Sequence, residues 1–231
     1  MKLAIMQPYF LPYIGYWQLI NAVDKFVIYD NIQYTKKGWI NRNRILNTDK
    51  EVYITIPLDK DSDYLDVDQR NISQCFDRMK LLNQVSQYYR KAPNFKIGLS
   101  IFEEIIMNNE KNLFKFIFNS IEVVCTYLSI ETPLIVSSGI DISHDLKGQD
   151  KVLTICKQLH ADEYINPIGG VDLYKREVFK AENIELKFLQ TQAFEYYQNR
   201  NEFIPHLSIL DVIMFNSKES IGLFLKEYKT I

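Results

Sequence analysis

The chain has 231 residues, of which 47% are hydrophobic and 24% charged, and its formal net charge is −2. These values are typical of a soluble globular protein with a substantial core. They argue against the broad basic surface that binding to nucleic acid or an anionic membrane requires. The three cysteines, Cys75, Cys125 and Cys156, lack metal-binding spacing, so we expect buried thiols in a reducing compartment.

The start of the chain argues against export. One lysine and a short apolar run precede Gln7 and Pro8, which is too little for a signal peptide. No apolar segment is long enough to span a bilayer. We therefore expect a cytoplasmic protein whose residues 1–231 form a single domain.

The first part of the chain alternates strand and helix. Residues 2–6 and 25–30 are predicted to be short buried strands, with a helix from Pro12 between them. Strand, helix and strand within about thirty residues indicate a parallel unit with a crossover helix. Residues 50–58 alternate and are rich in β-branched side chains, which predicts a third strand.

The middle of the chain has helical spacing and few strand formers, so residues 73–129 are interpreted as a helical insertion or subdomain. Its expected helices cover residues 73–89, 95–107 and 111–128. Later strands are expected at 133–137, 163–166 and 184–189, and later helices at 148–159, 172–181, 207–215 and 218–228. The predicted fold class is α/β, with a mainly parallel, Rossmann-like sheet and a helical insertion in the middle of the chain.

Parallel sheets bind ligands in the crevice at the carboxyl ends of their strands. The side chains that follow the predicted strands are therefore binding candidates. They are Gln7, Tyr9 and Tyr13, then Asp30 and Gln33, then Ser137, and finally Gly169 and Gly170.

The opening stretch, QPYFLPYIGYW, has two interpretations. It is either aromatic packing around a proline-stiffened turn or the floor of a pocket, with Gly15 allowing a ligand close to the helix backbone. Its layout is similar in outline to that of adenylating and nucleotidyl-transferring proteins with an HxGH signature. Tyr13 and Tyr16 stand where those proteins have histidines, so the phosphate chemistry of the histidines is not carried over.

A basic and aromatic segment follows the second strand. On an extended backbone Arg42 and Arg44 point to one side, and Asn41 and Asn43 point to the other. Arginine binds carboxylate or phosphate bidentately, and Trp39 offers a flat face to a base or sugar. This pattern predicts a site for a small anionic ligand, and the alternative is a surface hairpin with charged edges.

A third cluster is the stretch FIPHLSILD at residues 203–211. Ser208 and Asp211 fit a helix N-terminus at which the serine caps and the carboxylate reaches back. A nucleophilic Ser208 beside His206 is the alternative, although no nucleophile elbow surrounds it. The three histidines lie far apart without metal-ligand spacing, so no metal site is predicted.

Several segments together resemble the WbqC-like proteins, which are found with bacterial O-antigen and other surface-polysaccharide genes. The segments are QPYFLPYIGYWQLI, D-FVIYD-IQY, W-NRNRI, YYRKAPNF, ADEYINPIGGVDLY and FIPHLSILDVIMFN. The resemblance implies a role in lipopolysaccharide or related glycan biosynthesis. For some members it implies a glycine transferase that decorates amino sugars.

The function predicted is transfer of an amino acid such as glycine to the amine of a nucleotide-linked amino sugar. Asp30, Arg42 and Arg44 are the predicted catalytic residues, with Asp30 accepting the amine proton and the arginines holding diphosphate or carboxylate. The predicted substrate contacts are Gln7, Tyr9, Tyr13, Tyr16, Gln33, Trp39, Asn41, Asn43, Ser137, Gly169 and Gly170. The donor is open between ATP-dependent adenylation, an aminoacyl-tRNA and a thioester. The alternative function is a non-catalytic nucleotide-sugar-binding or accessory protein.

Overall fold

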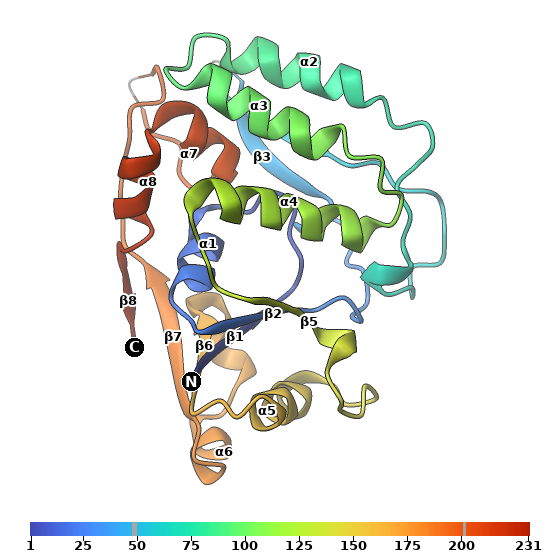
Figure 1. Cartoon of the computed structure of the whole chain (residues 1–231), viewed down its shortest axis with the longest axis vertical. Coiled ribbons are helices and arrows are strands. Elements are labelled where there is room, and N and C mark those ends of the chain that lie inside the picture. Colours follow the sequence, from blue (N-terminus) through green and yellow to red (C-terminus); the bar gives the residue numbers. More distant parts are fainter. Residues whose placement is uncertain (48–49, 201) are drawn as a thin grey trace.

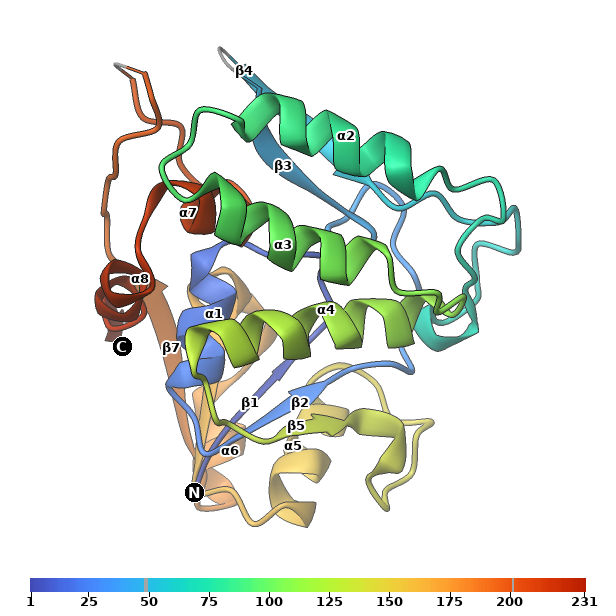
Figure 2. The ribbon, with the colours of Figure 1, turned by 45° about the horizontal axis from the view of Figure 1, so that its top comes forward.

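The computed structural model describes residues 1–47, 50–200 and 202–231. Over those residues, one sheet of six strands runs in the order β5-β2-β1-β6-β7-β8 (Figures 1 and 2). The strands are β1 (Lys2–Met6), β2 (Lys25–Ile28), β5 (Leu134–Val136), β6 (Glu163–Pro167), β7 (Glu185–Thr191) and β8 (Tyr228–Thr230). Neighbours pair in parallel except β7 and β8. The predicted mainly parallel α/β fold is confirmed.

The helices begin close to where their capping residues predict. They are α1 (Ile14–Asn21), α2 (Arg78–Tyr89), α3 (Phe95–Ile106), α4 (Leu113–Leu128), α5 (Gly148–Gln158), α6 (Arg176–Ala181), α7 (Ile209–Phe215) and α8 (Lys218–Phe224). Asp77 caps α2, Asn112 caps α4 and Ser208 caps α7, each accepting a hydrogen bond from a backbone N–H of the first turn. The predicted cap at Ser208 is therefore confirmed.

The two faces of the sheet carry different cores because side chains alternate along each strand. Leu3 and Ile5 of β1 pack with α5 and α6, whereas Ala4 belongs to a larger cluster with α1 and the helical middle. Figure 1 shows α2, α3 and α4 on one side of the sheet and α5 and α6 on the other. Buried side chains of α2, α3 and α4 thus share a core with the sheet. The division into one domain with an insertion at 73–129 stays a prediction.

Four parts of the chain differ from the expectation. The predicted helix at 73–89 begins only at Arg78, because Asp77 caps α2 there. The predicted strand at 50–58 becomes β4 (Lys50–Thr55), which pairs antiparallel with β3 (Arg42–Asn47) in a separate hairpin. The predicted helix at 172–181 is shorter, because a 3-10 helix (Ile168–Leu173) precedes α6. The predicted helix at 218–228 ends at Phe224, because residues 228–230 pair with the edge of β7 instead.

Two smaller findings concern the thiols and the membrane. Cys125 and Cys156 are buried as expected, but Cys75 is exposed. In the part of the chain described, no helix combines the length and the apolarity needed to cross a bilayer.

The order of the strands in the sheet predicts where a ligand-binding crevice lies. From β1 the chain moves to β2 and β5 on one side, then crosses back to β6 and β7 on the other. The strand order therefore reverses between β1 and β6, and ligands of such sheets bind at the carboxyl ends of the strands near this point. Gln7 follows β1 there, and the segment after Thr191 follows β7.

Gly98 of α3 gives a test of the packing between α3 and α7. A Cβ on Gly98 would lie 2.5 Å from Sδ of Met214, whereas a Cβ on Gly222 in α8 would meet no atom within 4 Å. Both alanine substitutions gain similar helix propensity, about 1 kcal/mol. Only Gly98→Ala overpacks the core, which costs about 1–3 kcal/mol. In urea unfolding, we expect the free energy of unfolding of Gly98→Ala to be about 1–3 kcal/mol lower than that of Gly222→Ala. Equal free energies would contradict the close packing of Gly98 against Met214.

Candidate functional site

Two adjoining cavities, of about 380 and 240 Å³, lie beside the start of α1, and we call them together the aromatic cleft. Tyr13 and His206 border both cavities. The larger one is also lined by Thr191 at the end of β7 and by Phe194 and Tyr196 from the segment that follows. The smaller one is also lined by Tyr9, Pro12, Trp39, Asn43 and Arg44. The opening stretch, the basic segment and the FIPH segment therefore meet at one site.

Hydrogen bonds to the backbone of Leu11 hold these three segments together. The Asn43 amide donates to the carbonyls of Phe10 and Leu11, at 3.0 Å each. The Ser208 hydroxyl donates to the same Leu11 carbonyl at 2.7 Å. Leu11 has a positive φ of 44°, a conformation that non-glycine residues adopt only where the surroundings impose it. The loop after β1 is thus fixed by side chains from two distant segments.

Tyr13 covers the start of α1. A Cβ on Gly15 would lie 2.5 Å from Cε2 and Cζ of the Tyr13 ring, so glycine is needed for the ring to lie there. The space above Gly15, which the pocket interpretation of the opening stretch gave to a ligand, is filled by this ring. The edge of the Tyr13 ring meets His206, with ring centroids 5.7 Å apart. Tyr13 therefore forms the partition between the two cavities.

The tyrosines of the cleft are neutral hydrogen-bonding groups. Burial raises the pKa of Tyr13, and a hydrogen bond with Thr191 opposes that shift. Burial, with a smaller contribution from Tyr13, also raises the pKa of Tyr9. Both phenols therefore keep their protons at neutral pH and can donate to a ligand.

Arg44 provides a cation at the rim of the smaller cavity. Its guanidinium lies 5.5 Å from the centroid of the Trp39 ring and forms a 2.6 Å ion pair with Glu51. It also donates a long hydrogen bond, 3.4 Å, to the carbonyl of His206. Trp39 is itself 38% exposed. An incoming phosphate or carboxylate would compete with Glu51 for a guanidinium already stacked on an aromatic face.

Arg42 lies on the same side of β3 but outside the cleft. It donates to the carbonyls of Lys37 and Gly38, and its guanidinium lies 4.7 Å from the centroid of the Tyr53 ring. Arg42 is not among the residues that line either cavity. Of the predicted arginine pair, the structure brings only Arg44 to the site.

Asp30 lies at the end of β2 in a different hollow. Its carboxylate is buried and accepts hydrogen bonds from the Ser137 hydroxyl at 2.7 Å and from the backbone and hydroxyl of Ser138. That hollow also contains Asp68 and Lys115. The three predicted catalytic residues, Asp30, Arg42 and Arg44, therefore do not share one cavity, and a common role stays a prediction.

Several predicted substrate contacts are used inside the protein. Tyr16 is buried and donates to the carbonyl of Gln7 at 3.0 Å. Asn41 is buried, accepts from the Tyr34 hydroxyl at 2.8 Å and donates to the carbonyl of Ile56. These side chains position the backbone around the cleft, and direct contact of Tyr16 or Asn41 with a substrate stays untested.

The remaining predicted contacts are spread along the carboxyl edge of the sheet. Gln7 accepts a 3.4 Å hydrogen bond from Tyr9, and the exposed Gln33 donates to the carbonyl of Asp63. Gly169 is exposed, whereas Gly170 is buried, and a Cβ there would collide with the Asn166 amide. None of these four residues lines the aromatic cleft.

His206, Thr191 and Tyr196 are cleft residues that the sequence did not indicate as contacts. His206 is exposed, and its φ of 58° places it in the left-handed region. Thr191 is the last residue of β7 and Tyr196 follows that strand. The signal that could have found them is the aromatic run after that strand, together with the histidine in FIPH.

Asp211 does not reach back to the start of α7 as predicted. It is fully buried and accepts hydrogen bonds from Tyr89 at 2.7 Å, Tyr196 at 2.6 Å and Gln198 at 3.1 Å. The two phenols draw the carboxylate into the core, away from the first-turn N–H groups. Asp211 therefore supports Tyr196, which lines the cleft.

No metal centre accompanies these groups in the described residues. Among residues 1–47, 50–200 and 202–231, no group of three or more His, Cys, Asp or Glu is placed to hold an ion. The described lining of the cleft offers phenols, an imidazole, a guanidinium and aromatic faces, together with the carboxylate of Glu195, the hydroxyl of Thr191 and the amides of Asn43 and Gln192.

The Asp211 carboxyl makes stability depend on pH. Burial raises its pKa from an ordinary 3.8 to about 6, so the native state binds the proton more tightly than the unfolded state does. Ionised Asp211 therefore lowers stability at neutral pH, and that cost disappears as pH falls from 6 towards 4. Relative to Asp211→Asn, we expect the wild type to gain about 2 kcal/mol between pH 7 and pH 4 in urea unfolding. If the difference in free energy of unfolding between the wild type and Asp211→Asn does not vary with pH, the raised pKa of Asp211 is wrong.

Arg44 and Arg42 form a matched pair for a binding test. Lysine keeps the charge but loses the bidentate guanidinium, so Arg44→Lys should weaken an anionic sugar nucleotide by about 1.5–3 kcal/mol. Arg42→Lys makes the same chemical change outside the cleft and should leave affinity unchanged. Calorimetric titration with UDP- and dTDP-linked amino sugars measures both. Equal losses of affinity in the two variants, or a large loss of stability in Arg44→Lys, would show that Arg44 does not bind the ligand.

In comparison with known proteins, the chain matches one family over nearly its whole length. The model of the WbqC-like protein family matches residues 7–222, which include every segment that lines the cleft. The chain is also 28% identical over 218 residues to the "Uncharacterized protein Rv1507c" of Mycobacterium tuberculosis (strain ATCC 25618 / H37Rv), covering 93% of each chain. No solved structure matches it significantly. The chain belongs to the WbqC-like protein family.

Proposed function

We propose that this protein is an enzyme of bacterial surface-polysaccharide biosynthesis that transfers an amino acid, glycine, to the amine of a nucleotide-linked amino sugar. The observation that carries the proposal is the meeting of three family segments at one aromatic cleft with an arginine at its rim. Flat aromatic faces suit sugar rings and bases, and a guanidinium suits a diphosphate. The cleft thus supplies the chemistry that a sugar nucleotide requires.

The sugar nucleotide would bind in the smaller cavity. Arg44 would exchange its ion pair with Glu51 for the diphosphate, while Trp39 stacks on the base or the sugar. The neutral phenol of Tyr9 would donate to a sugar hydroxyl. Tyr13 lines both cavities, so the amine of the sugar would lie next to it and to His206.

The acyl donor would bind in the larger cavity, across the partition formed by Tyr13 and His206. The amine nitrogen attacks the carbonyl carbon of the activated glycine, a C–N bond forms, and the bond to the leaving group breaks. The exposed imidazole of His206, which lines both cavities, would accept the proton released from the amine. The Tyr13 hydroxyl, which keeps its proton, can donate to the developing oxyanion.

A second candidate function is a binding protein that carries no reaction. The observation that favours it is the separation of Asp30 from the cleft, which leaves the predicted proton acceptor in another hollow. A binder would need the aromatic faces and Arg44 but not His206. The two functions therefore differ in what His206 does.

The test combines binding and product analysis. Purified protein is mixed with UDP- and dTDP-linked amino sugars and with glycine supplied in three parallel forms, as glycine with ATP, as glycyl-tRNA and as a glycyl thioester. We expect one sugar nucleotide to raise the melting temperature and to gain one glycyl residue by mass spectrometry. Stabilisation without a mass change under every donor would support the binder instead.

His206→Asn is the variant that separates the functions. Asparagine tolerates the left-handed conformation of residue 206, so the backbone is preserved while the proton acceptor is removed. We expect kcat to fall by about 10²–10⁴-fold, the range for loss of a general base, with sugar-nucleotide affinity within about twofold. An unchanged kcat would exclude His206 from the chemistry.

A further inference from the structure

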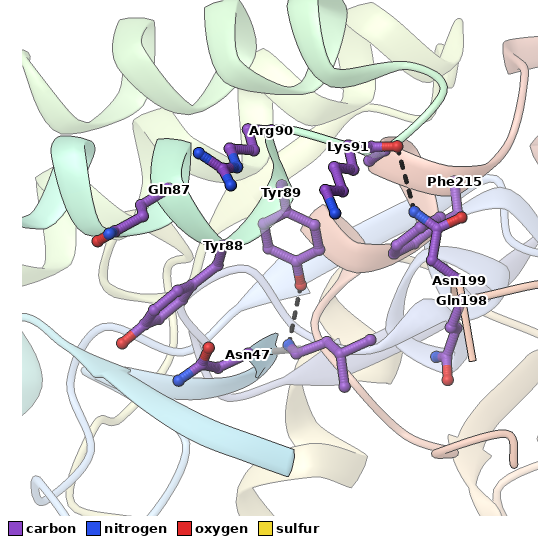
Figure 3. A pocket seen from close by; sticks show the side chains of 11 residues that line it. Asn47, Gln87, Tyr88, Tyr89, Arg90, Lys91, Gln198, Asn199 and Phe215 are labelled. Atoms are coloured by element: carbon purple, nitrogen blue, oxygen red, sulfur yellow. Dashed lines mark hydrogen bonds between the residues drawn. The ribbon is translucent and has the colours of Figure 1, made fainter. Parts of the chain in front are cut away.

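A third cavity lies at the end of α2, away from the aromatic cleft. It measures about 500 Å³ and is lined by Gln87, Tyr88, Arg90 and Lys91 from α2 and the residues after it, and by Gln198 and Asn199 from the segment after β7. We call it the α2 hollow. Figure 3 shows the side chains of these two segments around it, with Tyr89 between them. The stretch YYRKAPNF, which the cleft does not use, supplies much of its wall.

Among the described residues that line the α2 hollow, the charged side chains are all cations. Arg90 and Lys91 are exposed, and neither has an ion pair within the part of the chain that the structure describes. The described lining residues include no carboxylate. In contrast, Arg44 at the cleft is neutralised by Glu51. The α2 hollow therefore has two cations without an ion pair in its described lining.

Neutral polar and aromatic groups complete the lining. Asn199 donates to the carbonyl of Lys91 at 3.1 Å, which ties the two walls together. The floor is held by Tyr89, whose oxygen accepts the backbone N–H of Leu46 at 3.0 Å and whose ring packs against Phe215. The side chains of Gln87 and Tyr88 add donors and an aromatic face beside Arg90. This lining suits a ligand with an anionic group, hydroxyls and a flat ring.

We propose that the α2 hollow is a second binding site that takes a phosphorylated small molecule, with its phosphate held by Arg90 and Lys91. A phosphate carries more charge and more acceptor oxygens than a carboxylate, so it uses both cations and the neighbouring amides together. The site does not depend on the transferase activity proposed for the cleft, because Arg90 and Lys91 do not line the cleft.

The α2 hollow and the cleft are separated by one layer of side chains. Tyr89 and Gln198 line the hollow and donate to Asp211, and Tyr196 donates to the same carboxylate from the side of the cleft. A ligand seated on Tyr89 therefore lies next to a group that fixes the wall of the cleft.

Calorimetric titration with inorganic pyrophosphate and with ADP tests the site. We expect both probes to bind, and the double variant Arg90→Ala/Lys91→Ala to weaken both by about tenfold or more. The matched control is Lys175→Ala/Lys180→Ala, which removes two exposed lysines at the other end of the molecule, on and next to α6 (Figure 1). The control should stay within about twofold of the wild type. Arg44→Lys is titrated as well, because any binding of the same probes at the cleft would be weakened only in that variant and is fitted as a separate site. Thermal melting verifies that each variant is folded. If the alanine double variant is not, Arg90→Gln/Lys91→Gln removes the same charges with a smaller change in side-chain size.

The outcomes separate this site from the cleft. Loss of binding in the Arg90/Lys91 variant alone supports the α2 hollow, whether or not glycyl transfer is observed. Loss in Arg44→Lys alone would assign phosphate binding to the cleft and overturn the second site. Equal losses in the matched control would show nonspecific attraction, and absence of binding to the wild type would also overturn the proposal. Binding of ADP but not of pyrophosphate would contradict recognition through the phosphate.

Discussion

The arrangement of the cleft depends on how the backbone carbonyl of Leu11 is satisfied. A buried carbonyl without a partner is costly. This one lies in an irregular loop, outside the backbone hydrogen bonds of any strand or helix, so its donors must be side chains. Asn43 and Ser208 supply it, from segments that are distant in sequence. Because both donors converge on one atom, the opening stretch, β3 and the start of α7 are held in one fixed relation. The cleft is the space that this relation leaves between them.

The hydrogen bond from Asn43 to the Leu11 carbonyl explains why the asparagines of the basic segment face inward. Residues on an extended strand alternate, so a strand that sends Asn43 to the Leu11 carbonyl must send Arg42 and Arg44 to the opposite side. The two arginines then differ only in what lies beside them. Arg44 is next to Trp39 and His206, whereas Arg42 lies over Tyr53. Position along one strand therefore separates a cation that lines the cleft from one that lies outside it.

Periodicity in the sequence predicted most of the fold. The buried strand at Lys2–Met6 and the helices of the middle were found because their patterns are local. The pairing of residues 228–230 with β7 was missed because the edge of a sheet, not the local sequence, decides it. The candidate site was found only in part for the same reason. Tyr9, Tyr13, Trp39 and Arg44 have recognisable chemistry, but that His206 borders the same space as Tyr13 follows from the tertiary structure.

Asp211 shows that the cleft and the α2 hollow form one unit. Burying a carboxylate is unfavourable, and its raised pKa records that cost, so a merely structural role would be served as well by a neutral group. An ionised carboxylate differs from an amide in one respect: both of its oxygens can only accept. Tyr89 and Tyr196 must then both act as donors towards it, one from each cavity. The charge thus favours both phenols as donors from opposite walls, each to its own oxygen, whereas an asparagine offers a single acceptor oxygen.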